Sequence, residues 1–196
     1  DTSFAAGCGE TIGVIGGTGS GKSTLIDLIC RFYDADCGTV SLFGHDVKQY
    51  SFAQLRSLVG IVPQQAVLFT GTIRDNMQWA APNATDAEIW EALEIAQAAD
   101  FVRGKPGMLD APVETAGLDF ATDAALRKAI KEKTQGMTVF IVSQRAASVQ
   151  RADHILVLDD GTLAGDAPHA ALLQSCEVYK EICLSQLSKE EVAKTL

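Results

Sequence analysis

The chain has 196 residues, 47% of them hydrophobic, and a formal net charge of −9 at pH 7. This length and apolar content fit one folded domain with its own core, which excludes a chain that is disordered throughout. The negative charge repels nucleic-acid phosphates and no basic stripe offsets it, so neither DNA nor RNA is expected as the main ligand.

The sequence also limits which membrane roles and metal sites are possible. No apolar run approaches the roughly 20 residues that cross a bilayer, so a membrane role would require a partner or a part outside this sequence. The five dispersed cysteines lack the CxxC spacing of zinc or redox sites, which favours reduced thiols in a cytosolic protein. The chain begins with Asp1 rather than Met, and we interpret it as an excised, soluble fragment.

The hydrophobic pattern alternates between two periods along the chain. Short apolar runs predict strands at 11–15, 39–43, 60–63, 138–142 and 154–158. Apolar residues at helical spacing predict helices at 23–33, 51–59, 85–103 and 120–133 and in the segments after Pro168. This alternation indicates an α/β fold with a largely parallel sheet flanked by helices, and such sheets bind ligands beyond the carboxyl ends of their strands.

A glycine-rich segment joins the first predicted strand to the first helix. It matches GxxxxGK(S/T) with one more threonine, in the residues Gly16, Gly17, Thr18, Gly19, Ser20, Gly21, Lys22, Ser23 and Thr24. In this pattern the glycines let backbone N–H groups face phosphates, the lysine reaches the β and γ phosphates, and the serine hydroxyl ligates magnesium. We therefore predict a P-loop NTPase fold that binds a nucleotide triphosphate with Mg²⁺; an incidental glycine-rich turn is the alternative.

Further segments resemble one family. The residues at 61–65 (IVPQQ) and 68–76 (LFTGTIRDN) resemble the Q-loop region of ATP-binding cassette (ABC) exporters. The match continues through 31–34 (RFYD), a D-loop-like 116–119 (AGLD) and the segment at 159–169. The resemblance implies one ABC-type nucleotide-binding domain over 1–196, which binds ATP and Mg²⁺.

The resemblance also implies roles for three residues. Gln64 corresponds to the Q-loop glutamine, which reaches magnesium and the attacking water, and Asp119 to the D-loop aspartate, which acts across a dimer of cassettes. Their alternatives are an ordinary polar loop residue and a helix N-cap, respectively. Gln144 occupies the switch position, where hydrolytically active cassettes have a histidine; glutamine can donate a hydrogen bond there but carries no charge. This change resembles the degenerate half of a heterodimeric exporter.

Parts of the family pattern are missing from the sequence. The signature helix and the Walker B strand have no room between Glu114 and Gly117, so a few dozen residues are absent near 113–118, either from the sequence as written or from a true deletion product. We expect the absent strand to lie beside the P-loop strand, which would leave unpaired backbone there. The segment at 155–160 (ILVLDD) mimics a Walker B strand, but we interpret it as an ordinary late strand. The aromatic residue that stacks on adenine in the family would lie upstream of this sequence. The expected preference for ATP over GTP therefore rests on the family resemblance alone.

Three functional hypotheses follow. The first is an exporter's ATP-binding domain, at the cytoplasmic face of the membrane through attached transmembrane domains and paired with a second cassette; its intact parent would be an ATPase, whereas this chain would be impaired in hydrolysis. The second is a regulatory or structural half that holds ATP without hydrolysing it. The third is a small-molecule P-loop kinase, for which the sequence shows no arginine-bearing lid.

Overall fold

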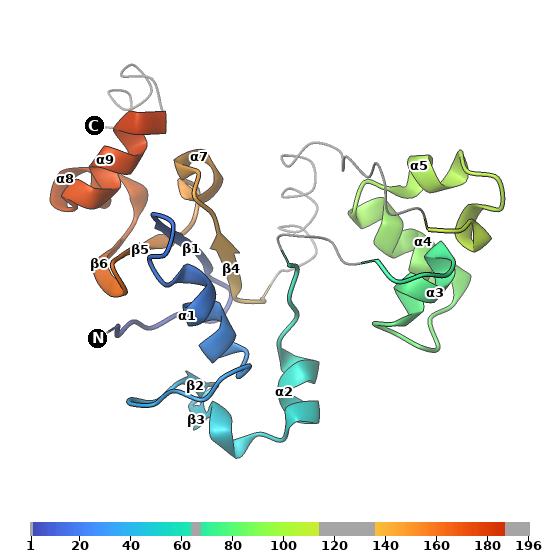
Figure 1. Cartoon of the computed structure of the whole chain (residues 1–196), viewed down its shortest axis with the longest axis horizontal. Coiled ribbons are helices and arrows are strands. Elements are labelled where there is room, and N and C mark those ends of the chain that lie inside the picture. The colour runs from blue at the N-terminus through green and yellow to red at the C-terminus, as the bar shows by residue number, and fades with distance from the viewer. Residues whose placement is uncertain (1, 64–67, 114–135, 187–196) are drawn as a thin grey trace. The chain divides into compact units, whose positions relative to one another are not determined.

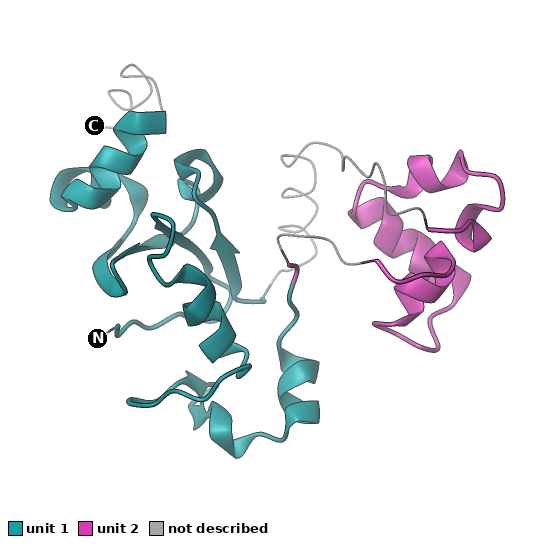
Figure 2. Ribbon diagram, in the orientation of Figure 1, with its two compact units in different colours: residues 1–61, 136–196 teal, residues 62–135 magenta. Residues whose placement is uncertain are grey.

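The structure is a computed structural model that describes residues 2–63, 68–113 and 136–186 (Figure 1). The chain divides into two compact units, one formed by residues 1–61 and 136–196 and the other by residues 62–135 (Figure 2). The predicted helix at 120–133 lies outside the described residues.

A four-stranded sheet forms the centre of unit 1. Its strands are β1 (Thr11–Gly16), β4 (Val139–Val142), β5 (His154–Asp159) and β6 (Thr162–Ala167), in the order β4-β1-β5-β6. β1 runs parallel to both β4 and β5, and β5 pairs with β6 as an antiparallel hairpin. The central strands are buried on both faces, as their continuous apolar runs predict, and Ile12, Val14 and Ile155 are each 0% exposed. The sheet confirms the predicted α/β class.

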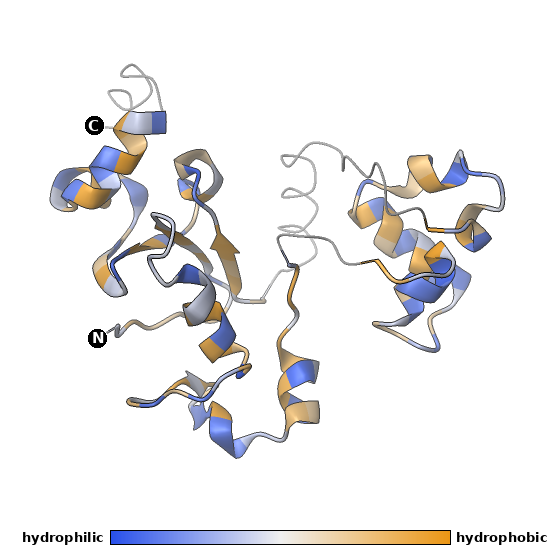
Figure 3. Cartoon of the chain, in the orientation of Figure 1, coloured by the Kyte–Doolittle hydropathy of each residue, from blue (hydrophilic) through white to orange (hydrophobic). Residues whose placement is uncertain are grey.

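The neighbours of β1 correct one expectation. We expected a missing strand directly beside the P-loop strand, but β4 pairs with β1 from Thr11 to Val14 and β5 pairs with it from Ile12 to Gly16. Both edges of β1 are therefore occupied. Within the described ranges the sheet ends at β4 on this side, and Figure 3 shows this strand coloured as hydrophobic. The strand is nevertheless only half-buried, with Val142 42% exposed.

Helices and a small hairpin complete unit 1. They are α1 (Lys22–Ile29), β2 (Ser41–Leu42), β3 (His45–Asp46), η1 (Val47–Gln49), α2 (Phe52–Leu58), α7 (Ala146–Val149), α8 (His169–Ser175) and α9 (Glu177–Gln186). The helices α7, α8 and α9 share one core with β1 and β5, which contains Ile15, Val149, Val157, Leu172 and Tyr179. A second core joins Ile12, Val14, Leu156 and Leu158, with Leu25 of α1 packed against it.

Two predicted strands differ from the structure. The run at 39–43 forms only the short β2–β3 hairpin, because Phe43 and Gly44 adopt φ of 50° and 80° and turn the chain back after Leu42. Residues 60–63 form no strand: Val62 is 90% exposed and Pro63 has no N–H to donate to a neighbouring strand. A β-branched run becomes a strand only where a partner strand is available.

Unit 2 is a helical cluster. It contains α3 (Ile73–Gln78), α4 (Asp86–Ile95), α5 (Ala99–Arg103) and η2 (Met108–Asp110), around a core of Ile89, Leu93, Ala99, Val102 and Leu109. Arg74 forms ion pairs with Asp86 and Asp110 and so ties α3 to the start of α4 and to η2. The capping box of Thr85 and Glu88 is present, as predicted.

The predicted helix at 85–103 is two helices in the structure. Gln97 adopts φ of 57° and the Ala98 N–H donates to the Leu93 carbonyl at 2.8 Å. A left-handed residue followed by this hydrogen bond satisfies the last carbonyls of a helix and ends it. Because glutamine is not a typical residue for this conformation, the sequence carried little signal for the break.

Candidate functional site

The predicted P-loop connects the carboxyl end of β1 to the amino end of α1. β1 ends at Gly16 and α1 begins at Lys22, and the loop between them includes Gly19 and Gly21 with φ of 80° and 93°. Residues with a side chain rarely adopt this left-handed backbone, so glycine is strongly favoured at both positions. Gly21 is the N-cap of α1 and contributes no side-chain hydrogen bond, which leaves the first N–H groups of the helix without a side-chain cap. An uncapped helix N-terminus attracts anions.

The glycines of the loop serve two different purposes. A Cβ atom on Gly16 would lie 2.2 Å from the Leu158 carbonyl oxygen of β5 and 2.6 Å from Ser20 Oγ, so Gly16 permits the close packing of the loop on the sheet. A Cβ atom on Gly17 or Gly19 would meet no described atom within 4 Å. This part of the loop is therefore open, and a ligand can approach its backbone directly.

Lys22 is held inside the loop as a buried cation. The residue is 9% exposed, and its Nζ donates to the carbonyl oxygens of Gly16 and Gly17 at 2.9 and 2.5 Å and to Ser20 Oγ at 3.2 Å. Burial lowers the pKa of Lys22 below its usual value, because desolvation disfavours the charged form. Within the described part of the chain, the ammonium group contacts only neutral oxygens, and no carboxylate pairs with it. An anionic ligand would supply the missing charge.

Most of the remaining P-loop side chains face solvent. Thr18, Ser23 and Thr24 are exposed, whereas Ser20 is buried at 4% and contacts Lys22. Ser23 is the second residue of α1, so its hydroxyl lies at the same helix end as the uncapped N–H groups. This position is compatible with the predicted magnesium ligand.

The predicted switch residue follows β4 at the same edge of the sheet. Ser143 N–H donates to the Val14 carbonyl of β1 at 3.0 Å, which holds the segment beside the strand that enters the P-loop. Gln144 is exposed, and its backbone carbonyl oxygen accepts a hydrogen bond from Gln186 Nε2 of α9 at 2.8 Å. The structure therefore brings the P-loop and Gln144 to one end of the sheet. Sequence reasoning missed Gln186; its helical spacing from Tyr179 and Cys183 was the one available signal.

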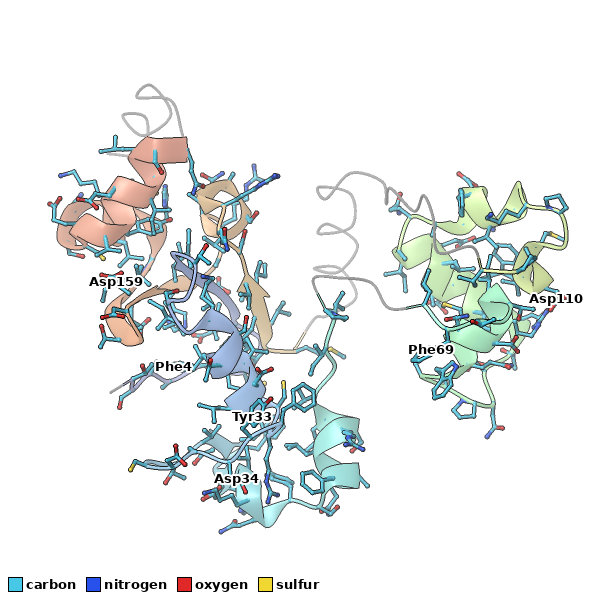
Figure 4. All side chains as sticks on the ribbon, viewed as in Figure 1. Phe4, Tyr33, Asp34, Phe69, Asp110 and Asp159 are labelled. Atoms are coloured by element: carbon cyan, nitrogen blue, oxygen red, sulfur yellow. The ribbon has the colours of Figure 1, made fainter. Side chains whose placement is uncertain are left out.

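The late acidic turn also lies at this end of the sheet. Leu158 pairs with Gly16, so Asp159, the last residue of β5, lies next to the P-loop (Figure 4). Asp159 is exposed, and the chain turns at Asp160 and Gly161, with φ of 43° and 73°, into β6. This hairpin is the arrangement expected of an ordinary late strand.

Two predicted site residues, Gln64 and Asp119, lie outside the described residues. In the described ranges, no group of three or more histidine, cysteine, aspartate or glutamate side chains could hold a metal ion. None of the described helices is long and apolar enough to cross a membrane. All five cysteines are free thiols.

Comparisons with known proteins identify a family. The model of the ABC transporter family matches residues 1–162. An uncharacterised ABC transporter ATP-binding protein of Mycobacterium tuberculosis is 33% identical over 219 residues, which cover 95% of this chain and 38% of the relative. The ATP-dependent lipid A-core flippase of Photobacterium profundum is 32% identical, with 93% of this chain and 37% of the relative covered.

The structure of a bacterial Atm1-family ABC exporter with ATP bound is similar with a TM-score of 0.88 and 28% identity, over 95% of this chain and 38% of that chain. The chain thus spans less than two fifths of the length of these proteins. An alignment of 219 residues is longer than the 196 residues of this chain, so it includes gaps in this chain. The resemblance to ABC exporters is confirmed. The chain belongs to the ABC transporter family and corresponds to the ATP-binding domain of its exporter-type members.

Proposed function

We propose that the chain binds ATP with Mg²⁺ at the P-loop and acts as the ATP-binding half of an exporter. The observation that carries this proposal is the buried Lys22 ammonium group, which is held by neutral oxygens beside an uncapped helix N-terminus. A cation that is desolvated before the ligand arrives gains more from a phosphate than a solvated surface lysine does. The open backbone at Gly17 and Gly19 lets the phosphates reach it.

The residues present fit a magnesium nucleotide. Mg²⁺ is usually bound by one or two protein oxygens together with substrate phosphates and water, so a dedicated cluster of carboxylates is not required. The exposed Ser23 hydroxyl at the start of α1 provides one such oxygen. We assign Gln64 as a second ligand on the basis of the family resemblance. When bound, the metal neutralises phosphate charge.

Hydrolysis by this chain is proposed to be impaired. Phosphoryl transfer needs an oriented water as well as charge neutralisation. Gln144 can donate a hydrogen bond to a γ-phosphate but cannot ionise, and the segment that would supply a catalytic carboxylate is absent from the sequence. The gaps in the 219-residue alignment are consistent with such an absence. We therefore favour a chain that holds ATP and pairs with a second, active cassette. Asp119 of this chain would act across that dimer.

Attached transmembrane domains are the proposed second partner, at the cytoplasmic face of the membrane. About three fifths of the length of the matched relatives lies outside the region that this chain covers. In unit 1 a shallow groove of about 210 Å³ runs between the end of α1 and α2, and Phe32, Leu55, Val59 and Ile61 line it. Phe32 is 57% exposed. We assign the exposed apolar side chains of this groove to the surface that contacts these domains.

The proposal is tested by titrating the full chain with ATP in the presence and absence of Mg²⁺ by calorimetry. The native chain is expected to bind ATP more tightly with Mg²⁺ and to show negligible single turnover. Ser23→Ala is expected to remove most of the benefit of Mg²⁺ while metal-free ATP binding is retained. Ser57→Ala changes an exposed serine of α2 and is the matched control. Absence of ATP binding by the native chain, or an equal response of both variants, would refute the assignment.

A further inference from the structure

Gln186, the last residue of α9, contacts the backbone of the residues that follow β4, 143–146, which we call the switch segment. Its side-chain amide contacts residues 144 and 146, which are 42 and 40 positions away in the sequence. We propose that Gln186 is a positioning residue, which sets the place of Gln144 relative to the third phosphate of the nucleotide. This inference rests on the proposed function, because it concerns the same ATP site.

The two hydrogen bonds use both halves of the amide. Gln186 Nε2 donates to the Gln144 carbonyl at 2.8 Å, and Gln186 Oε1 accepts from the Ala146 N–H at 2.9 Å. A flipped amide would place donor against donor and acceptor against acceptor, so one orientation alone satisfies the pair. The contact therefore defines both the distance and the rotation of the segment relative to α9.

The Ala146 N–H has a particular need for this partner. Ala146 is the first residue of α7 and is 0% exposed, so water cannot readily serve its N–H group. The N-cap residue Arg145 contributes no side-chain hydrogen bond, and the Ser143 hydroxyl accepts from the Arg145 N–H instead. Gln186 thus caps α7 from another helix.

The position of Gln186 is itself well determined by the core. Tyr179 and Cys183 are both 0% exposed and pack with Ile15 and Val149, and Gln186 continues the same face of α9 at i+7 and i+3. The Tyr179 hydroxyl also hydrogen-bonds His169 Nδ1 at 2.7 Å. The core thus anchors the face of α9 that carries Gln186.

The opposite side of the switch segment is tied to the P-loop strand. Ser143 N–H donates to the Val14 carbonyl, two residues before β1 ends at Gly16. Gln144 therefore lies between a tether to β1 and a tether to α9, while its own side chain is exposed and available to a ligand. Removal of the Gln186 tether frees one side of this segment and leaves the P-loop itself unchanged.

The test compares ATP with ADP, because only ATP carries the phosphate that Gln144 would contact. In Gln186→Met, which keeps the length of the side chain and removes the amide, the ratio of ATP to ADP affinity is expected to fall about three- to tenfold. ADP affinity and the melting temperature are expected to stay near those of the native chain. Gln174→Met is the matched control, since Gln174 is an exposed glutamine of α8 whose side chain makes no hydrogen bond in the part of the chain that the structure describes.

Hydrogen exchange provides a second measurement that does not depend on nucleotide. The Ala146 amide is expected to exchange at least tenfold faster in Gln186→Met, with amides 12–15 of β1 unchanged. Gln186→Glu keeps an acceptor for the Ala146 N–H and is expected to restore its protection. It is not expected to restore discrimination for ATP, because a carboxylate would face the Gln144 carbonyl.

Three outcomes would overturn the inference: unchanged exchange at Ala146, an equal loss of ATP and ADP affinity, or faster exchange throughout unit 1. The last two would indicate a purely structural role. Failure of the proposed function looks different, because a native chain that binds neither nucleotide refutes that function. The exchange at Ala146 would still decide whether Gln186 holds the segment.

Discussion

Replacement of Lys22 with methionine separates the charge of the P-loop lysine from its packing. Methionine has a similar length and no charge, so Lys22→Met keeps the loop filled while it removes the ammonium group. Lys22 is 9% exposed, and its ammonium group contacts the carbonyl oxygens of Gly16 and Gly17 and Ser20 Oγ. We expect a large loss of nucleotide binding and a small change in stability.

The magnitude follows from the burial of the lysine. One unit charge about 4 Å from Nζ, at an effective dielectric constant of about 20, gives about 4 kcal/mol, which corresponds to roughly a thousandfold in affinity. The desolvation of Lys22 that lowers its pKa is already present in the unliganded fold, so it does not reduce this gain. In the unliganded chain, Lys22→Met removes hydrogen bonds, which destabilises the fold, and removes the cost of burying a charge, which stabilises it. These two effects oppose each other, so the melting temperature is expected to change little.

The assay is a fluorescence or calorimetric titration with ATP and Mg²⁺, together with thermal unfolding of the unliganded chain. Lys48→Met, which changes an exposed lysine of unit 1, is the matched control and is expected to bind as the native chain does. A Lys22→Met chain that binds within tenfold of the native affinity would refute the electrostatic argument. A large drop in its melting temperature would show that the ammonium group supports the fold instead.

Three further predictions concern stability. Gly16→Ala is expected to lower the free energy of unfolding by about 1 to 3 kcal/mol, because its Cβ would lie 2.2 Å from the Leu158 carbonyl oxygen. The control Gly17→Ala is expected to change it by no more than about 0.5 kcal/mol, and equal effects of the two variants in denaturant titrations would contradict this. Burial lowers the pKa of His169 below 6.5, so the unfolded chain takes up its proton first and acidification from pH 7.5 to 5.5 is expected to lower the melting temperature. His169→Asn removes this contribution, and an identical pH dependence in that variant would count against it. Thr85→Ala is expected to cost about 1 kcal/mol through loss of the capping box, seen as faster hydrogen exchange confined to α4; no change there would argue against the cap.

Much of the local structure could be predicted from short stretches of sequence. The apolar run at 11–15, the glycines after it and the helical spacing from Ser23 placed the P-loop between a strand and a helix, where the structure has it. The Thr85 and Glu88 capping box was likewise predictable, because its hydrogen bonds join residues three positions apart. The family resemblance was visible for the same reason, since its motifs are contiguous.

Interactions between distant segments were decided by the tertiary structure. The order of the strands gave β1 two neighbours from late in the chain, which the expectation of a missing strand beside it did not anticipate. The Gln97 conformation that divides the helix at 85–103 depends on the packing of Ala98 and Leu93 in one core. Gln186 contacts the switch segment 40 residues away, and only the packing of α9 on the sheet brings the two together. Periodicity reports which residues are buried, whereas the partner of each buried face depends on the whole fold.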